Sequence, residues 1–414
     1  MLLTDRDIYE VEDAVSALTC RLSSIKSYET VSLNEASGRI LSEDITAPVS
    51  VPSFPKSAMD GYAVRSSDIS SASAGSPVRL NVIALITAGD MIPDSVKGTA
   101  DLEGCAVRIM TGAVVPSGFD TVIRQEDTDY GESEVLIFKA QGPYVNYCRI
   151  GEDIKEGQTV CSSGTLIGRA EAGVLASLGI CEVKVLRKIR VSVISTGSEI
   201  VEPGTELKEG QIYNSISYML ASSLNKPSFE VITNVVPDDI DKIVEVLTEA
   251  EKYSDIIITT GGVSVGQKDL LPEAVDRIGA VKVFSNINIK PGSPTIGAVI
   301  NGKALICLSG NPYAAVANYD LYVSNAAASI TGCKAFIPER QTAVLQSDYE
   351  KTSNIRRLVR AYVCSGEVTI HTKNQASSVL GSYLNSNCYI DFPKGSNKRK
   401  GDKVDIIMIP EALL

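Results

Sequence analysis

The sequence predicts a multidomain protein of the α/β plus β class: a doubly wound, mostly parallel sheet domain with an inserted small β-barrel domain, an elongated arm domain and a C-terminal β-rich domain. Three observations lead to this prediction. The chain has 414 residues, too many for one core at roughly 100 to 200 residues per domain. Between about 188 and 331, apolar β-branched runs alternate with helical patterns. Short strand patterns occupy the regions before and after it.

The N-terminal region predicts a small β domain inserted into the arm. Residues 49–143 carry short alternating strands separated by Gly, Pro and Asp, as in a small barrel or sandwich. The expected strands are 78–86, 105–110, 121–125 and 135–139. The flanking pieces, 1–48 and 144–184, are then expected to pair into the elongated arm domain.

The central region, 185–332, predicts the sheet domain. The expected buried strands are 190–196, 229–236, 255–260 and 303–309, and the expected helices lie near 213–225, 238–252, 270–278 and 312–330. Strands that alternate with helices form a mostly parallel sheet with helices on both faces. Ligands of such sheets bind beyond the carboxyl ends of the strands, so the residues that follow these strands are the first candidates for a site.

The last region, 333–414, predicts a compact β-rich domain. It contains strand patterns, a short helix that starts near Ser377, and a basic turn at 394–401.

Composition excludes several classes of function. The net charge of −11 and the isoelectric point near 4.9 disfavour nucleic-acid binding through a basic face. No apolar run approaches the roughly 18 residues that a membrane span needs. The segment 4–10 is acidic and amphipathic, unlike a secretory signal. A cytoplasmic protein is therefore expected, without nucleic-acid or membrane partners.

The cysteine and histidine content restricts the possible metal chemistry. Nine cysteines are scattered without a CxxC pair, which favours reduced thiols. A single histidine, His371, makes imidazole zinc sites and Ser-His-Asp catalysis implausible. A metal would be hard and bound by oxygen, with Mg²⁺ the first choice.

Acidic residues follow three of the predicted strands. Gly261 and Gly262 come directly after one strand, where backbone amides can approach an anion, and Asp269 lies near the start of the next helix. The alternative is a plain turn with Asp269 as helix cap. Glu199 and Asp238 follow two other strands. Three carboxylates at one rim would repel one another unless a cation is bound. Alternatively, Glu199 is an exposed loop acid and Asp238 caps a helix.

Positively charged groups that could bind an anion are expected at two other turns. Lys290 stands beside a Pro-Gly turn, where its ammonium can meet an oxygen of a phosphate or another oxyanion. Pro312 suits the first turn of a helix, which would leave the amides of Gly310 and Asn311 free at its positive end. Three arginines could face the same cleft, although a solvated strand face is the alternative for at least one; they are Arg356, Arg357 and Arg360.

Several segments resemble signature motifs of the molybdopterin molybdenumtransferases, a family that includes the E-domain of gephyrin. Ser-Ala-Met-Asp-Gly-Tyr-Ala at 57–63 and Thr-Gly-Gly-Val-Ser-Val-Gly-Gln-Lys-Asp at 260–269 carry the resemblance most clearly. The other similar segments are 31–44, 108–113, 195–199, 290–292 and 310–312. The resemblance therefore runs nearly end to end.

The resemblance implies an enzyme that inserts molybdate into adenylylated molybdopterin, releases AMP and completes the molybdenum cofactor. It implies Mg²⁺ at Glu199, Asp269 and either Asp238 or Asp239, and a dimer in which the arm mediates dimerisation. A molybdopterin adenylyltransferase is a possible partner. Within the 260–269 loop, Gly261, Gly262 and Ser264 are expected to contact the substrate.

The same resemblance changes the interpretation of two other positions. Asp60 precedes Gly61, and an Asp-Gly pair is ordinarily a turn; by resemblance, Asp60 enters the active site and acts on the metal or on water. Thr111 is by pattern a strand end, and by resemblance its hydroxyl can bond an oxyanion.

This sequence departs from the family pattern at several positions: Pro55, Lys56, Asn286, Ser293 and Ser309. Pro55 and Lys56 stand where Asp-Asn is common, and Ser309 replaces a usual proline. Ser293 replaces a frequent lysine and Asn286 another basic residue, so two cations are missing from the expected anion site. Lys56 or an arginine of the terminal domain would have to compensate.

Two other functions stay open. The first is a molybdopterin adenylyltransferase-like enzyme, which shares the sheet domain but lacks the β insertion and the Asp60 loop. The second is a non-catalytic scaffold of the gephyrin E-domain type.

Overall fold

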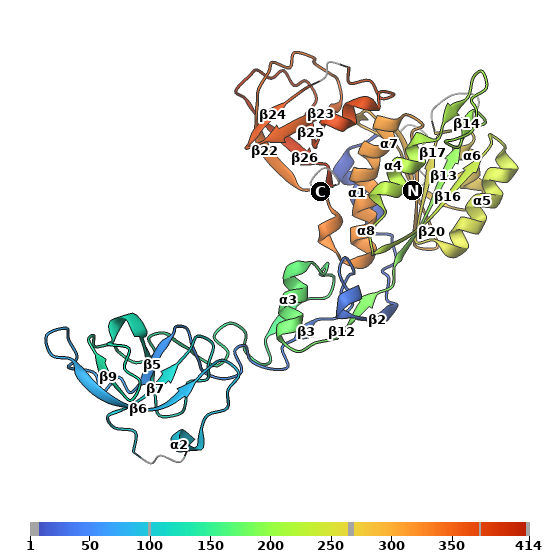
Figure 1. The fold of residues 1–414 in the computed structure, drawn as a ribbon. Coiled ribbons are helices and arrows are strands. Elements are labelled where there is room, and N and C mark those ends of the chain that lie inside the picture. The colour runs from blue at the N-terminus through green and yellow to red at the C-terminus, as the bar shows by residue number, and fades with distance from the viewer. Residues whose placement is uncertain (1–7, 98–100, 264–268, 372–373, 411–414) are drawn as a thin grey trace. The chain divides into compact units, whose positions relative to one another are not determined.

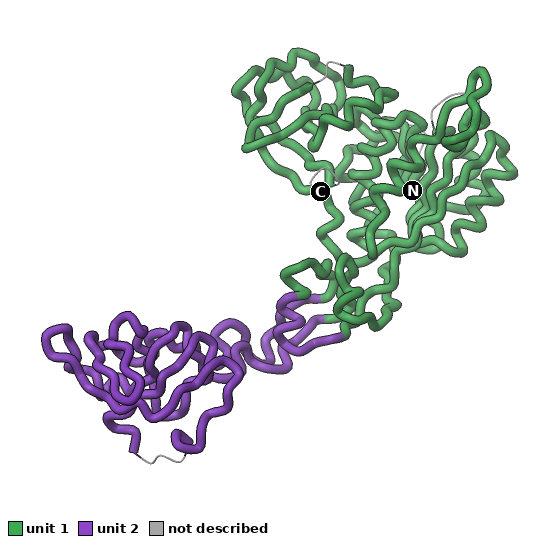
Figure 2. The backbone as a smooth tube through the Cα atoms, viewed as in Figure 1, with its two compact units in different colours: residues 1–43, 163–172, 182–414 green, residues 44–162, 173–181 purple. Residues whose placement is uncertain are grey.

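The computed structural model describes residues 8–97, 101–263, 269–371 and 374–410. The chain forms two compact units, shown in Figure 2: unit 1 comprises residues 1–43, 163–172 and 182–414, and unit 2 comprises residues 44–162 and 173–181. The expected finer division into four domains stays a prediction.

A seven-stranded mixed sheet is the centre of unit 1 (Figure 1). Its strands, in spatial order, are β1 (Ile8–Tyr9), β18 (Val281–Ile287), β20 (Pro294–Ile300), β21 (Lys303–Leu308), β17 (Ile256–Thr260), β13 (Ile189–Thr196) and β16 (Phe229–Val236). The four predicted strands are confirmed to within a residue or two. They run parallel to one another. Sequence analysis does not predict the other three strands: β18 and β20 make antiparallel pairs, and β1 pairs in parallel with β18.

Helices cover both faces of this sheet, as the alternation of strands and helices predicts. One core contains residues of α1 (Val11–Thr19), α4 (Ser215–Ser223), α7 (Pro312–Asn318) and α8 (Ser324–Thr331). The other contains residues of α5 (Ile240–Tyr253) and α6 (Leu271–Arg277). The helix predicted at 312–330 is present, with a π-helical turn at Tyr319–Val323 between α7 and α8.

The parallel strands bring their carboxyl ends to one edge of the sheet. Ser195 is in register with Thr260, and Thr260 with Leu308. The loops that follow β13, β17 and β21 therefore begin side by side, and this edge is where the sequence predicts the site.

The C-terminal region is a closed five-stranded barrel. Its strands are β22 (Arg340–Leu345), β23 (Arg356–Cys364), β24 (Glu367–Thr369), β25 (Cys388–Phe392) and β26 (Lys403–Met408). The pairing runs β23, β24, β22, β26, β25, and β25 pairs again with β23. A two-residue strand, β19 (Ile289–Lys290), adds to β23 in parallel. The short helix predicted near Ser377 is a turn there, followed by a 3₁₀ helix at Gly381–Asn385.

The pieces that flank the β insertion pair with each other, as predicted. In unit 1, β2 (Tyr28–Ser32) runs antiparallel to β12 (Glu182–Leu186). In unit 2, β3 (Ile45–Thr46) pairs with β11 (Thr159–Cys161). Helix α3 (Arg169–Ser177) and a 3₁₀ turn at Leu33–Glu35 complete this region.

Unit 2 contains the inserted β domain, a five-stranded sheet. The strand order is β8 (Thr121–Arg124), β5 (Gly61–Val64), β7 (Cys105–Ile109), β6 (Val78–Ile86) and β9 (Glu134–Ile137). The four predicted strands are present, and β5 is an addition whose four residues are all buried. Gly61 is required there, because a Cβ atom would lie 1.8 Å from the carbonyl oxygen of Ile123. The shorter elements are β4 (Lys56–Ser57), β10 (Tyr147–Cys148) and α2 (Asp94–Lys97).

All nine cysteines are free thiols, as their scattered positions predict. Within the described residues, no helix is both long and apolar enough to cross a membrane.

Candidate active site

A cavity of about 270 Å³ lies at the carboxyl ends of the parallel strands. Five predicted site residues line it: Glu199, Gly261, Gly310, Asn311 and Pro312. Residues of the strand ends and of β15 (Ile212–Tyr213) complete its wall, together with Asn214 and Ser378. We call this the central cavity.

Close packing explains why a glycine, Gly261, follows β17, in addition to its expected role in ligand binding. Gly261 has a φ of +92°, and a Cβ atom there would lie 2.3 Å from the carbonyl oxygen of Thr196. A Cβ atom on Gly310 would in turn lie 3.3 Å from the Cα atom of Gly261. Glycine at 261 thus lets the three loops begin in contact with one another.

The start of helix α7 is less open than the sequence predicts. The Asn311 amide donates to Ser309 Oγ at 3.2 Å, so the expectation that it is free is wrong. The Tyr313 amide donates to the carbonyl oxygen of Ser377 at 3.0 Å. Ser309 stands where the family pattern has proline, and its hydroxyl is what engages the Asn311 amide.

A network of buried hydroxyl groups forms part of the wall of the central cavity. Ser195 Oγ is 2.6 Å from Ser217 Oγ and 3.0 Å from Thr260 Oγ1, and it donates to Asn214 Oδ1 at 3.4 Å. Asn214 Nδ2 donates to Glu202 at 2.9 Å. The network fixes Asn214 in the cavity wall, because both ends of its amide are bonded.

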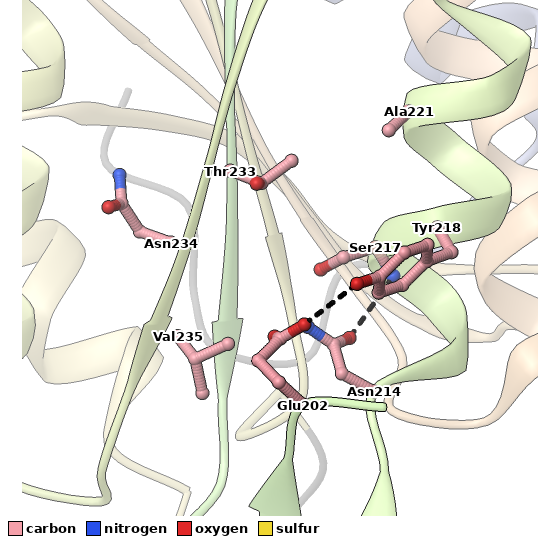
Figure 3. A pocket seen from close by; sticks show the side chains of 8 residues that line it. All are labelled: Glu202, Asn214, Ser217, Tyr218, Ala221, Thr233, Asn234 and Val235. Carbon is pink, nitrogen blue, oxygen red and sulfur yellow. Dashed lines mark hydrogen bonds between the residues drawn. The ribbon is translucent and has the colours of Figure 1, made fainter. Parts of the chain in front are cut away.

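Asn214 also lines a neighbouring cavity of about 410 Å³ between α4 and the edge strand β16, shown in Figure 3. Glu202 faces it and accepts hydrogen bonds from Asn214 Nδ2 and, at 3.1 Å, from the Tyr218 hydroxyl. No residue of the predicted site lines this cavity.

An acidic cavity of about 580 Å³ adjoins the central cavity. Glu199 lines both. Asp238 and Glu209 also line the acidic cavity, as does Leu270, which follows Asp269 in the chain. Glu209 was not among the predicted residues, because its exposed loop position gives no signal in the sequence.

The structure separates the roles of the two neighbouring aspartates. The Asp238 carboxylate accepts a hydrogen bond from the Ser198 amide at 3.2 Å, and the Asp238 amide donates to Ser198 Oγ at 3.2 Å. Asp239 is the N-cap of α5, accepting from the amides of Asp241 and Lys242 at 3.0 and 3.2 Å. The alternative in which Asp238 caps this helix is therefore wrong.

Asp269 does not occupy the cap position of the next helix. The N-cap of α6 is Leu270, whose side chain makes no capping hydrogen bond. The alternative in which Asp269 is the helix cap is thus not supported by the geometry. Ser264, expected to contact the substrate, lies outside the described residues.

The acidic cavity suits a magnesium ion that keeps water ligands. Its carboxylates are hard oxygen donors, the kind that Mg²⁺ prefers. In the described part of the chain, no three His, Cys, Asp or Glu side chains form a group that could hold a metal by themselves. An ion here would need oxygens from water or substrate as well, which is how Mg²⁺ usually binds beside phosphates.

A cationic cavity of about 660 Å³ adjoins the central cavity on the side of the barrel. Lys290, Lys351 and Arg357 supply its charge. Lys290 is the register partner of Arg357 in the β19–β23 pair, so these two cations come from adjacent strands. Asn311 lines both this cavity and the central one.

The barrel places two cations, Lys351 and Arg357, in the cavity where the expected lysine at position 293 is missing. Ser293, where the family pattern has lysine, lines the cationic cavity, and its hydroxyl donates to the carbonyl oxygen of Ile289. Arg357 is only 8% exposed, and a guanidinium with so little water around it favours an anionic partner. Lys56 lies in unit 2, in the short strand β4.

Of the three arginines predicted to face the cleft, the other two have structural partners, and neither is on a solvated strand face. Arg356 bonds Asp391 of the barrel and Glu12 of α1. Its bonds to Asp391, followed by those to Glu12, raise the pKa of Arg356 despite its burial. Arg360 is 1% exposed and stacks on Tyr313.

Asp60 and Thr111 form a pair within unit 2. Asp60 accepts hydrogen bonds from the amide and the hydroxyl of Thr111, and these bonds lower the pKa of Asp60, the amide having the larger effect. The carboxylate is therefore an acceptor, suited to bind a cation or to take a proton. The Thr111 hydroxyl donates to Asp60 in this structure, whereas the family resemblance implies that it bonds an oxyanion.

Three regions of the chain match family models, and together they span nearly all of it. Residues 9–179 match the MoeA N-terminal region (domain I and II), residues 192–328 a probable molybdopterin binding domain, and residues 342–409 the MoeA C-terminal region (domain IV).

Full-length relatives give the same result. A molybdopterin molybdenumtransferase of Staphylococcus aureus (strain COL) is 36% identical over 413 residues, covering 99% of this chain and 97% of the relative. One from Staphylococcus epidermidis (strain ATCC 12228) is 35% identical with the same coverage. The chain belongs to the molybdopterin molybdenumtransferase family.

A solved structure agrees with this assignment. The molybdopterin biosynthesis moeA protein from Pyrococcus horikoshii OT3 superposes with a TM-score of 0.84 at 31% identity, covering 97% of this chain and all of that one. The fold class predicted from the sequence is thereby confirmed.

Within this molybdopterin molybdenumtransferase fold, unit 1 brings most of the predicted residues to neighbouring cavities. Glu199, Gly261, Gly310, Asn311 and Pro312 meet in the central cavity; Asp238 and Lys290 occupy the cavities on either side. Asp60 and Thr111 belong to unit 2. Whether each residue has the role that the family resemblance implies stays a prediction.

Proposed function

We propose that this chain catalyses molybdenum transfer to molybdopterin: it takes adenylylated molybdopterin and molybdate, cleaves the phosphoanhydride to release AMP, and leaves molybdenum on the dithiolene sulfurs. One observation supports this assignment beyond the family membership. The central cavity shares Glu199 with the acidic cavity and Asn311 with the cationic cavity. A substrate with a metal-bridged phosphate and a second anionic group therefore meets both kinds of partner along one edge of the sheet.

The cationic side has the chemistry to hold the anions. Lys290 and Lys351 are compact charges on flexible stems, whereas the planar guanidinium of Arg357 can donate two parallel hydrogen bonds to an oxyanion. Both molybdate and a phosphate have oxygens that accept such bonds. Because these groups come from two domains of unit 1, the anion would be held from two sides.

The acidic side has the chemistry to hold Mg²⁺, and we propose that activity depends on this ion. Glu199, Asp238 and Asp269 would bind it, and the bound ion would neutralise charge on the pyrophosphate. The Asp60 carboxylate, kept ionised by Thr111, would orient water or molybdate by accepting a hydrogen bond.

We further propose a homodimer in which each active site takes Asp60 from one protomer and the acidic residues from its partner. The family resemblance supports this proposal. So does the surface of unit 2 around Asp60, where large apolar side chains are exposed: Phe54, Met59, Tyr144 and Val145. The segments that carry them are joined by the β4–β10 pair and by a hydrogen bond from the Ala58 amide to the Asn146 carbonyl. Exposed apolar groups that cluster in this way are typical of protein interfaces.

We propose a cytoplasmic location, which nine free thiols support, because structural disulfides are rare in reducing compartments. A molybdopterin adenylyltransferase, which makes the adenylylated substrate, is the proposed upstream partner.

A turnover assay tests the proposed function. The full chain is mixed with adenylylated molybdopterin and molybdate, and AMP release is followed with Mg²⁺ present or removed by a chelator. Release that requires both molybdate and Mg²⁺ is expected. Absence of release with both present would support the scaffold alternative, and adenylylation of molybdopterin from ATP would support the adenylyltransferase alternative.

A further inference from the structure

Arg360 is a buried cation whose partners are oxygens of one loop and two aromatic rings. It lies on β23 and is 1% exposed. Its guanidinium carbon is 3.9 Å from the ring centroid of Tyr313 and 5.4 Å from that of Tyr383. Burial lowers the pKa of Arg360, as expected for a charge removed from water. Such a residue is retained only where its contacts offset the cost of desolvation.

The loop that Arg360 contacts is 374–379, between the strands β24 and β25. The guanidinium donates to the carbonyl oxygens of Asn374 at 3.5 Å, of Ala376 at 3.4 Å and of Val379, and to Gln375 Oε1 at 3.5 Å. Several of these bonds are long, so each is weak by itself. Together they engage four of the six residues of the loop.

The backbone of Arg360 takes part as well. Its amide donates to Gln375 Oε1 at 3.1 Å, and its carbonyl accepts from Gln375 Nε2 at 3.1 Å. The Tyr313 amide holds the carbonyl of Ser377 from the other side. Loop 374–379 has no regular secondary structure, so these contacts fix its position.

The same loop forms walls of two cavities. Asn374, Gln375, Ala376 and Ser377 line the cationic cavity, and Ser378 lines the central cavity. The loop therefore lies where the two cavities adjoin, yet it carries no charge of its own. Arg360 faces the back of the loop and lines neither cavity.

We propose that Arg360 is a positioning residue for substrate binding: by holding loop 374–379 against α7, it sets the shape of the wall shared by the cationic and central cavities. The expected effect of Arg360 on turnover rests on the proposed function. Its expected effect on the position of the loop does not. Arginine suits the role because its planar fork binds several carbonyl oxygens while its face stacks on a ring. Lysine has neither property.

Arg356 provides a matched control. It lies on the same strand and is also largely buried, but its partners are Asp391 and Glu12 and not the loop. Arg360→Lys and Arg356→Lys make the same chemical change on one strand of the barrel. A general loosening of the barrel would affect both variants alike, whereas loss of loop position is specific to Arg360→Lys.

The experiment compares the two variants in the full-length chain by three measurements. Hydrogen exchange of a peptide spanning 374–380 reports the loop, because the Val379 amide is bonded to the Ala376 carbonyl. Calorimetric titration with molybdate alone reports the anion site. Steady-state AMP release gives KM and kcat for adenylylated molybdopterin. For Arg360→Lys we expect exchange about tenfold faster and KM about tenfold higher, as loss of one charge-assisted hydrogen bond implies, with kcat nearly unchanged.

The outcomes distinguish this proposal from the proposed function. If the wild type releases no AMP, the proposed function is wrong. Hydrogen exchange in the loop still tests the positioning role of Arg360 in that case. If exchange is unchanged in Arg360→Lys, or rises equally in Arg356→Lys, the positioning role is wrong. If Arg360→Lys does not fold, Gln375→Ala is used instead, because it removes the two bonds between the Gln375 side chain and the backbone of Arg360. Hydrogen exchange of the loop peptide must then be faster in Gln375→Ala than in the wild type.

Discussion

The amide and the hydroxyl of Thr111 both donate to one carboxylate oxygen of Asp60, Oδ1, each at 2.7 Å. This arrangement favours the ionised carboxylate and so lowers the pKa of Asp60. If turnover needs the carboxylate, activity is present above this lowered pKa and is lost as the pH falls through it.

Thr111→Val keeps the amide bond but removes the hydroxyl bond, so the pKa of Asp60 should rise. The acid limb of the pH profile for AMP release should then move to higher pH, with little change on the alkaline side. Rates measured from about pH 7 down to about pH 2.5, on both sides of the ordinary aspartate pKa of about 3.9, would show the shift. Thr111→Ser, which keeps the hydroxyl, should behave like the wild type. An acid limb that stays in place would show that protonation of Asp60 does not control turnover.

Asp238 and Asp239 are adjacent in sequence but differ in their surroundings, and their alanine variants should differ accordingly. Asp238→Ala removes a proposed Mg²⁺ ligand, so AMP release should be lost while the melting temperature changes little. Asp239→Ala removes the N-cap of α5 and should lower the free energy of unfolding by about 1 kcal/mol, with AMP release retained. Calorimetric unfolding and the turnover assay measure the two effects. Loss of activity in Asp239→Ala alone would reverse the assignment.

Ser293→Lys introduces the charge that the family resemblance leads us to expect at this position. It should tighten the binding of adenylylated molybdopterin and make that binding more sensitive to salt, because one more cation faces the anion. Titration calorimetry at two ionic strengths provides both quantities. The control is Ser293→Met, which has a similar length without the charge. Equal affinity and salt dependence in wild type and Ser293→Lys would mean that Lys351 and Arg357 already supply the charge.

The shared active site of the proposed homodimer can be tested by mixing variants. Asp60→Ala and Asp269→Ala homodimers should both be inactive. A heterodimer of the two would have one site with both changes and one with neither, since each site takes Asp60 from one chain and Asp269 from its partner.

Co-expression with two different tags isolates this heterodimer. AMP release close to half that of the wild-type dimer is expected. A doubly tagged species that is folded and paired but inactive would place Asp60 in the same site as Asp269 of its own chain, or outside the site.

The sequence predicts those parts of the fold in which a local pattern is strong. β13 and β17 are buried on both faces and consist largely of β-branched apolar residues, so both strands can be recognised from the sequence alone. β5 has only four residues, too few for a periodic pattern, and its first follows an Asp that suggests a turn. In β18, polar residues such as Ser285 and Asn286 interrupt the apolar run. The strand therefore does not stand out from a loop.

The same contrast holds for the candidate site. Glu199 and Asp238 follow two parallel strands of one sheet, β13 and β16, so topology alone predicts that they lie near one another. Lys351 and Arg357 come from the C-terminal barrel region of unit 1, and their place beside Lys290 depends on the two-residue pairing of β19 with β23. No periodic pattern in the sequence shows which arginine of β23 faces the cavity and which one is buried against the loop. Tertiary packing decides this.

None of the nine free cysteines lines the central, acidic or cationic cavity. The walls instead present carboxylates, amides, hydroxyls and cationic nitrogens. In the proposed reaction, molybdenum exchanges oxygen ligands for sulfur ligands. A cysteine thiolate in the cavity wall would compete with the substrate for the incoming metal. Since the described residues of these walls contain no sulfur, the dithiolene of the substrate would be the soft ligand for the metal, which could then leave with the product instead of remaining on the enzyme.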